Sequence, residues 1–212
     1  MVIIFDLDGT LLDSYPLIRQ NFVDVFNTYL PNHRYTESLL ESFFGPTLID
    51  SFLRVVHDEE LAKKLILKYR EFSIKNTPSF LRAFPDAQAS LKALKDRGYH
   101  LAVCSNKVKE AIKEGLLIGE LDAYIDYIVG FDDVKKPKPD PEGVKIILNH
   151  FQEPGVFVGD SPVDMETGKN AHLPTIGVTW ALFQKPELIK SGANYIAHQF
   201  KDLIKIVEEI HV

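Results

Sequence analysis

The chain has 212 residues, 45% of them hydrophobic, and a net charge of −6, so it can form one large domain or one domain with a smaller insert. Its acidic balance and the absence of a basic run exclude an electrostatic surface for nucleic acid. The single cysteine excludes an intramolecular disulfide, and no apolar run approaches the ~20 residues of a membrane span. Because the first strand starts almost at the first residue, we expect no signal peptide and a cytoplasmic protein that does not engage membranes.

The first predicted strand, Val2–Phe5, is apolar and ends in a pair of aspartates, Asp6 and Asp8, followed by Gly9 and Thr10. Two carboxylates at i and i+2 after a core strand are costly to place together unless a cation or a reacting group needs them. The carboxyl edge of a parallel sheet is also where ligands bind in α/β proteins. A plain strand running into an Asp-Gly turn is the alternative that this pattern alone leaves open.

Residues 14–82 contain helical patterns and no strand. Apolar residues fall on one face of a first helix ending near Pro31 and on one face of a later helix; they are Ile18, Phe22, Val25, Phe26 and Tyr29, then Leu61, Leu65, Tyr69 and Phe72. Gly45-Pro46 separates two shorter helical stretches. An insert of this length predicts a small all-helical domain, residues 14–82, within a core of residues 1–13 and 83–212. We expect it to cover the Asp6 loop; an insert that only adds stability is the alternative.

The rest of the chain alternates strands with helical patterns. The predicted strands are His100–Cys104, Tyr127–Val129, Val156–Val158 and Thr175–Val178. One helix is predicted over Ala87–Arg97, and another begins at Asp140-Pro141, where Asp suits the N-cap and Pro the first helical position. This alternation predicts an α/β fold, a Rossmann-like, doubly wound parallel sheet with the helical insert after its first strand.

Polar and basic residues follow the later elements. Ser105-Asn106 follows the second strand, where a hydroxyl beside backbone amides can donate hydrogen bonds to an anion. In the segment 135–141, three prolines hold the backbone extended. A lysine on such a rigid segment extends in a fixed direction, which suits binding of a phosphate. Lys136 and Lys138 both compete for this role, and we favour Lys138 because it lies just before the predicted helix.

Asp160 follows the strand Val156–Val158 and adds a third carboxylate at the same sheet edge. Three acids at strand ends suit a hard, oxygen-loving cation such as Mg²⁺. Asp164 lies one helical turn further, where it either reaches back to the site or favours the helix N-terminus. Because the net charge is negative, an anionic substrate has to be attracted locally, by a metal ion or by placed lysines.

Four segments carry a resemblance to a known family. They are Phe5-Asp6-Leu7-Asp8-Gly9-Thr10, Ser105-Asn106, Lys138-Pro139-Asp140-Pro141, and Val158-Gly159-Asp160 with Asp164. This series resembles the four motifs of the haloacid dehalogenase superfamily, in its phosphatase branch with a helical, C1-type cap after the first strand. Within that branch the chain is most similar to phosphoglycolate phosphatases and the cytoplasmic pyrophosphatases. One departure is Phe84-Pro85-Asp86, where many relatives carry Pro-Gly.

The resemblance implies a role for each motif. Asp6 would be the nucleophile that forms an aspartyl-phosphate, and Asp8 the general acid and base, which dehalogenase members lack. Mg²⁺ would be held by the Asp6 carboxylate, the Asp8 backbone carbonyl and Asp160, with Asp164 in support. Ser105, the Asn106 amide and Lys138 would hold the phosphoryl oxygens. Gly9 and Thr10 are further expected phosphate-binding residues, and Gly45 belongs to a loop, residues 44–47, expected to set substrate choice.

Several functions stay open at this point. The expected reaction is hydrolysis of a small, phosphoglycolate-like phosphomonoester by a monomer or weak homodimer. An inorganic pyrophosphatase and a sugar phosphomutase would use the same motifs. A non-catalytic receiver-like phospho-signalling module also uses an Asp, Mg²⁺ and a Lys, but it would leave Asp8 and the helical insert without a role.

Overall fold

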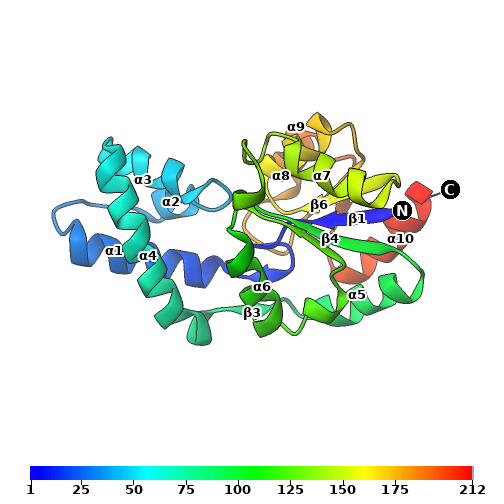
Figure 1. Ribbon diagram of the computed structural model, residues 1–212, viewed down its shortest axis with the longest axis horizontal. Coiled ribbons are helices and arrows are strands. Elements are labelled where there is room, and N and C mark those ends of the chain that lie inside the picture. The colour runs from blue at the N-terminus through cyan, green and yellow to red at the C-terminus, as the bar shows by residue number, and fades with distance from the viewer. Residues whose placement is uncertain (212) are drawn as a thin grey trace. The chain divides into compact units, whose positions relative to one another are not determined.

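A computed structural model describes residues 1–211 of the chain and the side chains of residues 1–210. The chain divides into two compact units (Figure 1). The larger unit combines Met1–Asp13 with the chain from Arg82 onward, and the smaller unit is Ser14–Leu81. The predicted role of the smaller unit as a cap stays a prediction.

Within the described part of the larger unit, six parallel strands form one sheet in the order β5-β4-β1-β6-β7-β8. They are β1 (Val2–Phe5), β4 (His100–Cys104), β5 (Tyr127–Val129), β6 (Gly155–Gly159), β7 (Thr175–Val178) and β8 (Tyr195–Ala197). β1 pairs with β4 on one side and with β6 on the other, so that Phe5 lies opposite both Val103 and Val158. The chain therefore reverses its direction across the sheet beside β1, the place where open α/β sheets bind ligands.

Helices cover both faces of this sheet (Figure 1). One face carries α7 (Glu142–Phe151), α8 (Pro162–Asn170) and α9 (Lys185–Ser191); the other carries α5 (Ala87–Asp96), α6 (Lys109–Ile118) and α10 (Phe200–His211). Two 3-10 turns, η1 (Asp122–Tyr124) and η2 (Phe131–Asp133), flank β5. A core cluster beneath α7 comprises Val2, Ile4, Ala102, Cys104, Val129, Val144, Ile147 and Phe157. The predicted doubly wound α/β fold is confirmed, with β8 as a strand that the sequence pattern missed.

A short antiparallel ribbon lies where the insert leaves and rejoins the larger unit. It pairs β2 (Leu12–Asp13) with β3 (Arg82–Ala83), so Arg82, at the predicted boundary, belongs to the larger unit. Just beyond it, Asp86 has φ 65, in the left-handed region that favours glycine. Asp is among the residues that tolerate this region, which explains how the chain makes the turn without the glycine of many relatives.

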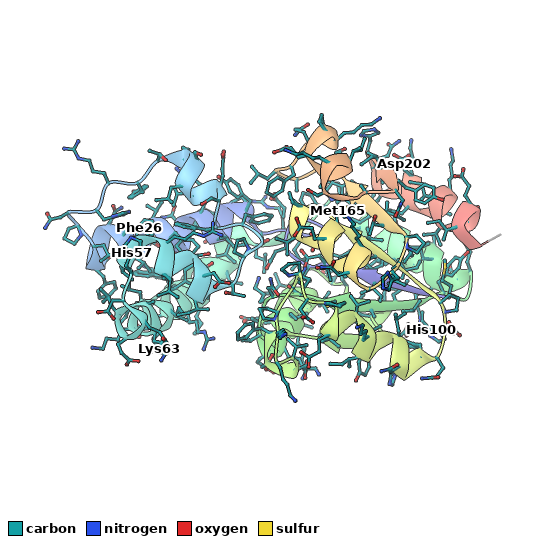
Figure 2. All side chains as sticks on the ribbon, turned by 90° about the horizontal axis from the view of Figure 1, so that it is seen from above. Phe26, His57, Lys63, His100, Met165 and Asp202 are labelled. Atoms are coloured by element: carbon teal, nitrogen blue, oxygen red, sulfur yellow. The ribbon has the colours of Figure 1, made fainter. Side chains whose placement is uncertain are left out.

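The smaller unit contains α1 (Tyr15–Tyr29), α2 (Glu37–Glu41), α3 (Leu48–Val56) and α4 (Glu59–Phe80). Thr36, Thr47 and Asp58 cap the last three helices, and each side chain accepts a backbone N–H from the residue three positions on. The core is aromatic: the ring of Phe22 lies 4.5–6.0 Å from those of Phe26, Phe43, Phe52 and Tyr69. Figure 2 shows Phe26 among these helices and Lys63 on their outer side.

Two positions on the predicted apolar faces of the smaller unit are exposed, and two others, Ile18 and Phe72, are half-buried. The Tyr29 side chain is 42% exposed and the Leu61 side chain is 37% exposed. Tyr29 is the last residue of α1, and Leu61 lies in the first turn of α4. Across residues 1–211, no helix combines the length and the hydropathy that a membrane span requires.

Candidate active site

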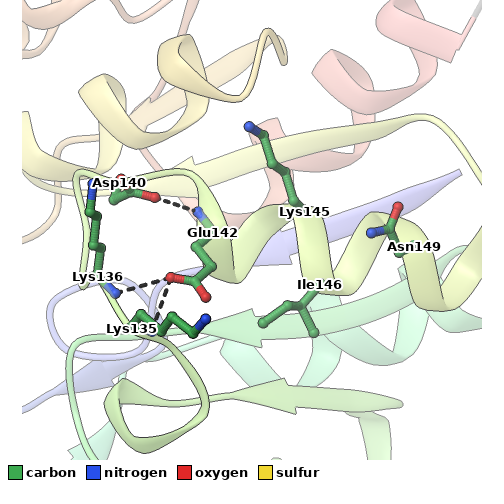
Figure 3. A pocket seen from close by; sticks show the side chains of 7 residues that line it. All are labelled: Lys135, Lys136, Asp140, Glu142, Lys145, Ile146 and Asn149. Atoms are coloured by element: carbon green, nitrogen blue, oxygen red, sulfur yellow. Dashed lines mark hydrogen bonds between the residues drawn. The ribbon is translucent and has the colours of Figure 1, made fainter.

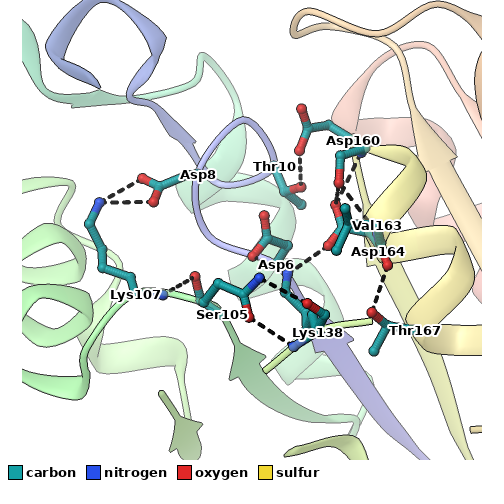
Figure 4. A network of polar contacts seen from close by, with 12 residues as sticks. Asp6, Asp8, Thr10, Ser105, Lys107, Lys138, Asp160, Val163, Asp164 and Thr167 are labelled. Carbon is teal, nitrogen blue, oxygen red and sulfur yellow. Dashed lines mark hydrogen bonds and ion pairs between the residues drawn. The ribbon is translucent and has the colours of Figure 1, made fainter. Parts of the chain in front are cut away.

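Three aspartates and one lysine meet at the carboxyl edge of the sheet beside β1 (Figure 4). Asp6 directly follows β1, Asp160 directly follows the neighbouring β6, and Asp164 lies in the first turn of α8. One carboxylate oxygen from each aspartate lies within 4.8 Å of the others. The structure thus brings Asp6 and Asp160 together and adds Asp164, for which the sequence left two roles open, whereas the Asp8 carboxylate is not a member of this group of three.

Lys138 is the cation of this cluster. Its buried ammonium Nζ donates to Asp6 Oδ1 at 2.7 Å and to Asp164 Oδ1 at 2.6 Å. Asn106 holds the Lys138 backbone from both sides: the Lys138 N–H donates to Asn106 Oδ1 at 2.9 Å, and Asn106 Nδ2 donates to the Lys138 carbonyl at 3.2 Å. Of the two candidate lysines, Lys138 therefore lies at the cluster, whereas the Lys136 side chain is exposed.

The cluster holds more negative than positive charge in a buried place. Burial raises the pKa of Asp6 to about 7, despite the opposing charge of Lys138. Burial, with the charges of Asp164 and Asp6, raises the pKa of Asp160 well above its ordinary value. For Lys138, burial lowers the pKa, but the charges of Asp164 and Asp6 outweigh it and the pKa lies above its ordinary value.

The same residues fit a bound cation. Asp160 is buried, and only its Oδ1 has a partner, the Thr10 hydroxyl, which donates at 3.3 Å. Its Oδ2 is buried with no hydrogen-bond partner among the described residues. An unpaired buried carboxylate oxygen is costly, and a hard cation bound by oxygen ligands would satisfy it. The donor set of this cluster therefore suits Mg²⁺.

Asp164 serves both of the functions that the sequence left open. Its Oδ1 faces Lys138, while its Oδ2 accepts from the Ser161 N–H at 3.0 Å and from the Ser161 hydroxyl at 2.6 Å. The Asp164 N–H in turn donates to Ser161 Oγ at 3.3 Å, and together with the Ser161 N–H bond this forms the capping box that starts α8. Gly159 makes this approach possible, because a Cβ there would lie 2.3 Å from the Cβ of Asp164.

Asp8 lies beside the cluster and has a cation of its own. Lys107 Nζ contacts both carboxylate oxygens of Asp8, at 2.7 and 2.9 Å (Figure 4). The Lys107 N–H donates to Ser105 Oγ at 3.3 Å, and the Lys107 carbonyl accepts from the Phe131 N–H at 2.9 Å. A single residue thus links the predicted acid–base group to the predicted phosphate-binding serine.

The other predicted phosphate-binding residues have these positions. Ser105 is buried directly after β4. The Thr10 hydroxyl donates to Asp160, and the Gly9 N–H donates to the Leu12 carbonyl at 2.8 Å, with a φ of 83 for Gly9. Gly45, with φ 104, lies in the smaller unit between α2 and α3. Contacts of these residues with phosphate stay predictions.

Sequence reasoning missed two residues at this site. Lys107 carried a usable signal, because it is the next residue after Ser105-Asn106 at the end of a central strand. Trp180 carried less: the sequence suggests only packing after β7. In the structure the Trp180 indole N–H donates to the Thr10 carbonyl at 3.1 Å, and its ring stacks on Phe200 with centroids 4.4 Å apart.

Comparison with known proteins agrees with this geometry. Residues 3–178 match the model of a family described as haloacid dehalogenase-like hydrolase. "Pyrophosphatase PpaX" of Listeria innocua is 31% identical over 212 residues, which cover 98% of this chain and 96% of that protein. The crystal structure of a predicted phosphatase from Clostridium acetobutylicum is 30% identical, with a TM-score of 0.87 and coverage of 98% of both chains. A haloacid dehalogenase-like family protein from Streptococcus pneumoniae shares the fold, at a TM-score of 0.85, 23% identity and 97% coverage of both chains.

The family model spans most of the chain, and the first of these relatives matches it almost from end to end. The resemblance inferred from the four sequence motifs is therefore confirmed. The chain belongs to the haloacid dehalogenase-like hydrolase family and is an enzyme of its phosphatase type.

Proposed function

We propose that this enzyme hydrolyses a small phosphorylated substrate by moving the phosphoryl group onto Asp6, with Mg²⁺ as its cofactor. The observation that carries the proposal is the buried cluster of Asp6, Lys138, Asp160 and Asp164 at the end of β1. It places a carboxylate nucleophile, a fixed cation and an unpaired acidic oxygen together, which are the elements that phosphoryl transfer needs.

The residues that would hold Mg²⁺ are the carboxylates of Asp6 and Asp160 and the backbone carbonyl of Asp8. Bound there, the ion would polarise the phosphoryl oxygens and offset the negative charge of the substrate. The buried Oδ2 of Asp160, which has no partner among residues 1–211, supports this assignment. Asp164 and Thr10 act as supports, because they orient Lys138 and Asp160, respectively.

In the first half of the reaction, an oxygen of Asp6 forms a bond to phosphorus as the bond from phosphorus to the leaving oxygen breaks. Lys138 contacts Asp6 through Oδ1 only, and Asp6 Oδ2 has no hydrogen-bond partner among the described residues. Oδ2 is therefore the oxygen placed to attack. Asp8, in its protonated form, gives its proton to the leaving oxygen, so that the leaving group departs as an alcohol or as an acid.

In the second half, water attacks the phosphorus of the aspartyl-phosphate. Asp8, now ionised, takes the proton of that water, the bond from phosphorus to Asp6 breaks, and inorganic phosphate leaves. Asp6 regains its carboxylate and Asp8 its proton, so that the cycle closes. Lys107 contacts both oxygens of Asp8, and because each oxygen keeps a second lone pair for a proton, this contact can orient Asp8 while it exchanges the proton.

The cations are needed for a simple electrostatic reason. A carboxylate that approaches a phosphate oxygen at ~4 Å is repelled by about 4 kcal/mol per charge pair at an effective dielectric near 20. Lys138 supplies attraction of the same size from a buried place, where salt screens it little. Its two carboxylate partners fix the direction of its ammonium group before substrate arrives.

Inorganic pyrophosphate is the second candidate substrate beside a phosphoglycolate-like monoester. The relative from Listeria innocua, named a pyrophosphatase, matches over 98% of this chain. The predicted contacts of Gly45 and its loop would decide between the two, because the core site acts on the phosphoryl group alone. The proposal that the protein is a monomer or weak homodimer is tested by its mass in solution.

The experiment is a phosphate-release screen with Mg²⁺ across phosphoglycolate, other small phosphomonoesters and pyrophosphate. We expect release from at least one of them, and we expect Asp6→Asn to lose it while its circular dichroism spectrum is unchanged. Asp122→Asn, an exposed aspartate in the same unit, is the matched control and should keep full activity. Phosphate release by Asp6→Asn at the rate of the unmodified enzyme would overturn the proposal.

A further inference from the structure

A cavity of about 470 Å³, widely open to solvent, lies in the larger unit over the segment 135–142 and α7 (Figure 3). It is lined by Lys135, Lys136, Asp140, Glu142, Lys145, Ile146 and Asn149. No member of the Asp6–Lys138 cluster is among these residues, so the proposed reaction does not use this cavity. Its volume is in the range of cavities that bind small molecules.

The acidic side chains of this cavity are turned toward the backbone. Glu142 Oε2 accepts the N–H groups of Lys135 and Lys136, each at 3.0 Å, and Asp140 Oδ1 accepts the N–H of Glu142 at 3.0 Å. These bonds tie the segment 135–136 to the first turn of α7. They engage one oxygen of each carboxylate, Oε2 of Glu142 and Oδ1 of Asp140.

The three lysines are, by contrast, without an acidic partner. Lys135, Lys136 and Lys145 are exposed, and none forms an ion pair with a described residue. In Figure 3, the Lys136 and Lys145 side chains lie on either side of Asp140 and Glu142. With three basic and two acidic side chains in its lining, the cavity carries a formal net charge of +1 on a chain whose net charge is −6, so it is a place where an anion is attracted locally.

The cavity is also held in shape before a ligand arrives. Pro137, Pro139 and Pro141 restrict the backbone that carries two of the lysines, and α7 carries the third. On α7, Asn149 neighbours Lys145 at a spacing of four residues and Ile146 at a spacing of three. Less ordering is then lost on binding than in a flexible basic loop.

We propose that this cavity is a second anion site, which binds a small molecule carrying phosphate groups with two or more negative charges. The phosphate oxygens lie among the ammonium groups of Lys135, Lys136 and Lys145. The remainder of the ligand contacts the apolar side chain of Ile146 and the amide of Asn149. Lysine suits this role, since a compact point charge binds phosphate without a fixed bidentate geometry.

The test is a nuclear magnetic resonance titration of the ¹⁵N-labelled, full-length protein in the presence of a chelator, so that turnover does not occur. The probes are inorganic pyrophosphate and glucose 6-phosphate. We expect saturable shifts of the backbone amides of residues 135–149 with both probes. An added shift at Ile146 and Asn149 with glucose 6-phosphate alone would indicate an organic ligand, and its absence an inorganic one.

Two triple variants complete the test. Lys135→Gln/Lys136→Gln/Lys145→Gln should weaken binding at residues 135–149 by about tenfold or more and leave shifts at Ser105 and Asn106 in place. The control, Lys190→Gln/Lys201→Gln/Lys205→Gln, removes the same charge from exposed lysines elsewhere in the unit and should leave binding intact. Equal weakening in both variants, or shifts that never saturate, would overturn the proposal, whatever the phosphate-release screen shows.

Discussion

Substitution of Asp160 by Asn tests two consequences of the negative charge in the cluster: its cost to the stability of the metal-free protein and its role in binding Mg²⁺. Asn keeps the shape of the side chain and an oxygen to accept from the Thr10 hydroxyl, but it removes one of three buried negative charges. We expect the metal-free variant to be more stable than the unmodified protein and its response to Mg²⁺ to be lost. An ordinary metal-ligand substitution would show only the second effect.

The size of the stabilisation follows from the distances. Two like charges at 4.8 Å or less repel by at least about 3 kcal/mol at an effective dielectric near 20, and Asp160 faces two such charges. Lost attraction to Lys138 offsets part of this gain, because its Nζ contacts Asp6 and Asp164. A net gain of about 2 kcal/mol raises the Tm of a chain of this size by about 4–8 °C.

The pH dependence has a definite sign. Folding raises the pKa of Asp160 above its ordinary value of 3.8. The contribution of this carboxyl group to the free energy of unfolding is therefore fully present below that pH and is lost as the pH rises toward the raised pKa. The advantage of Asp160→Asn should therefore be near zero at about pH 4 and largest at about pH 8. Thermal unfolding at both pH values, with a chelator, measures it, and Asp122→Asn serves as the control.

With Mg²⁺ added, the unmodified protein should become more stable to heat than Asp160→Asn, the reverse of the order without metal. At a concentration about 100-fold above its dissociation constant, a ligand stabilises the folded state by about 2.7 kcal/mol, or roughly 5–11 °C here. The unmodified protein should show this shift and Asp160→Asn should not. If the variant is less stable than the unmodified protein at about pH 8 without metal, or gains as much from Mg²⁺, the electrostatic reasoning is wrong.

Three further predictions concern single residues of the site. Lys138→Met should lower kcat by at least about 10³-fold and destabilise the metal-free protein by about 3–5 kcal/mol, because it leaves Asp6 and Asp164 buried without their cation. Steady-state kinetics measure the first effect and urea unfolding the second. A fully active variant would refute the role of Lys138. Lys107→Met should lower kcat by about 10-fold or more with little change in KM, because Asp8 loses the contact that positions it. Lys107→Arg should recover most of this loss in kcat. A change in KM alone would contradict the positioning role of Lys107. Gly159→Ala should cost about 1–3 kcal/mol or more, because its Cβ would collide with Asp164, and an unchanged urea midpoint would count against the close approach.

The sequence was informative about the fold because its strands are apolar runs with sharp ends. Val2–Phe5 and His100–Cys104 have the predicted bounds, since each is buried and stops at a polar residue. β8 was not predicted, because its three residues, two of them half-buried, show no clear alternation of apolar and polar positions. The helix predicted at Asp140-Pro141 begins one residue later, at Glu142, with Asp140 accepting the Glu142 N–H.

Which side chains lie at this sheet edge was more predictable from the sequence than how those side chains pair. Carboxyl ends of neighbouring parallel strands share one edge, which places Asp6 beside Asp160 without knowledge of side-chain geometry. The choice of Lys138 over Lys136 rested on its place before a helix, and its burial depends on contacts with Asn106 that no local pattern contains. The pairing of Asp8 with Lys107 joins residues 99 positions apart, which spacing along the chain does not reveal.

Phosphoryl transfer through Asp6 can be observed by trapping the phosphorylated enzyme. The protein is mixed with its best substrate and Mg²⁺, quenched in acid within the first turnover, digested, and analysed by mass spectrometry. We expect a peptide containing Asp6 that carries one phosphoryl group. When substrate is exhausted, the phosphorylated fraction of the enzyme should fall at the rate of phosphate release. Phosphate release with no phosphorylated peptide, or with the group on another residue, would contradict phosphoryl transfer through Asp6.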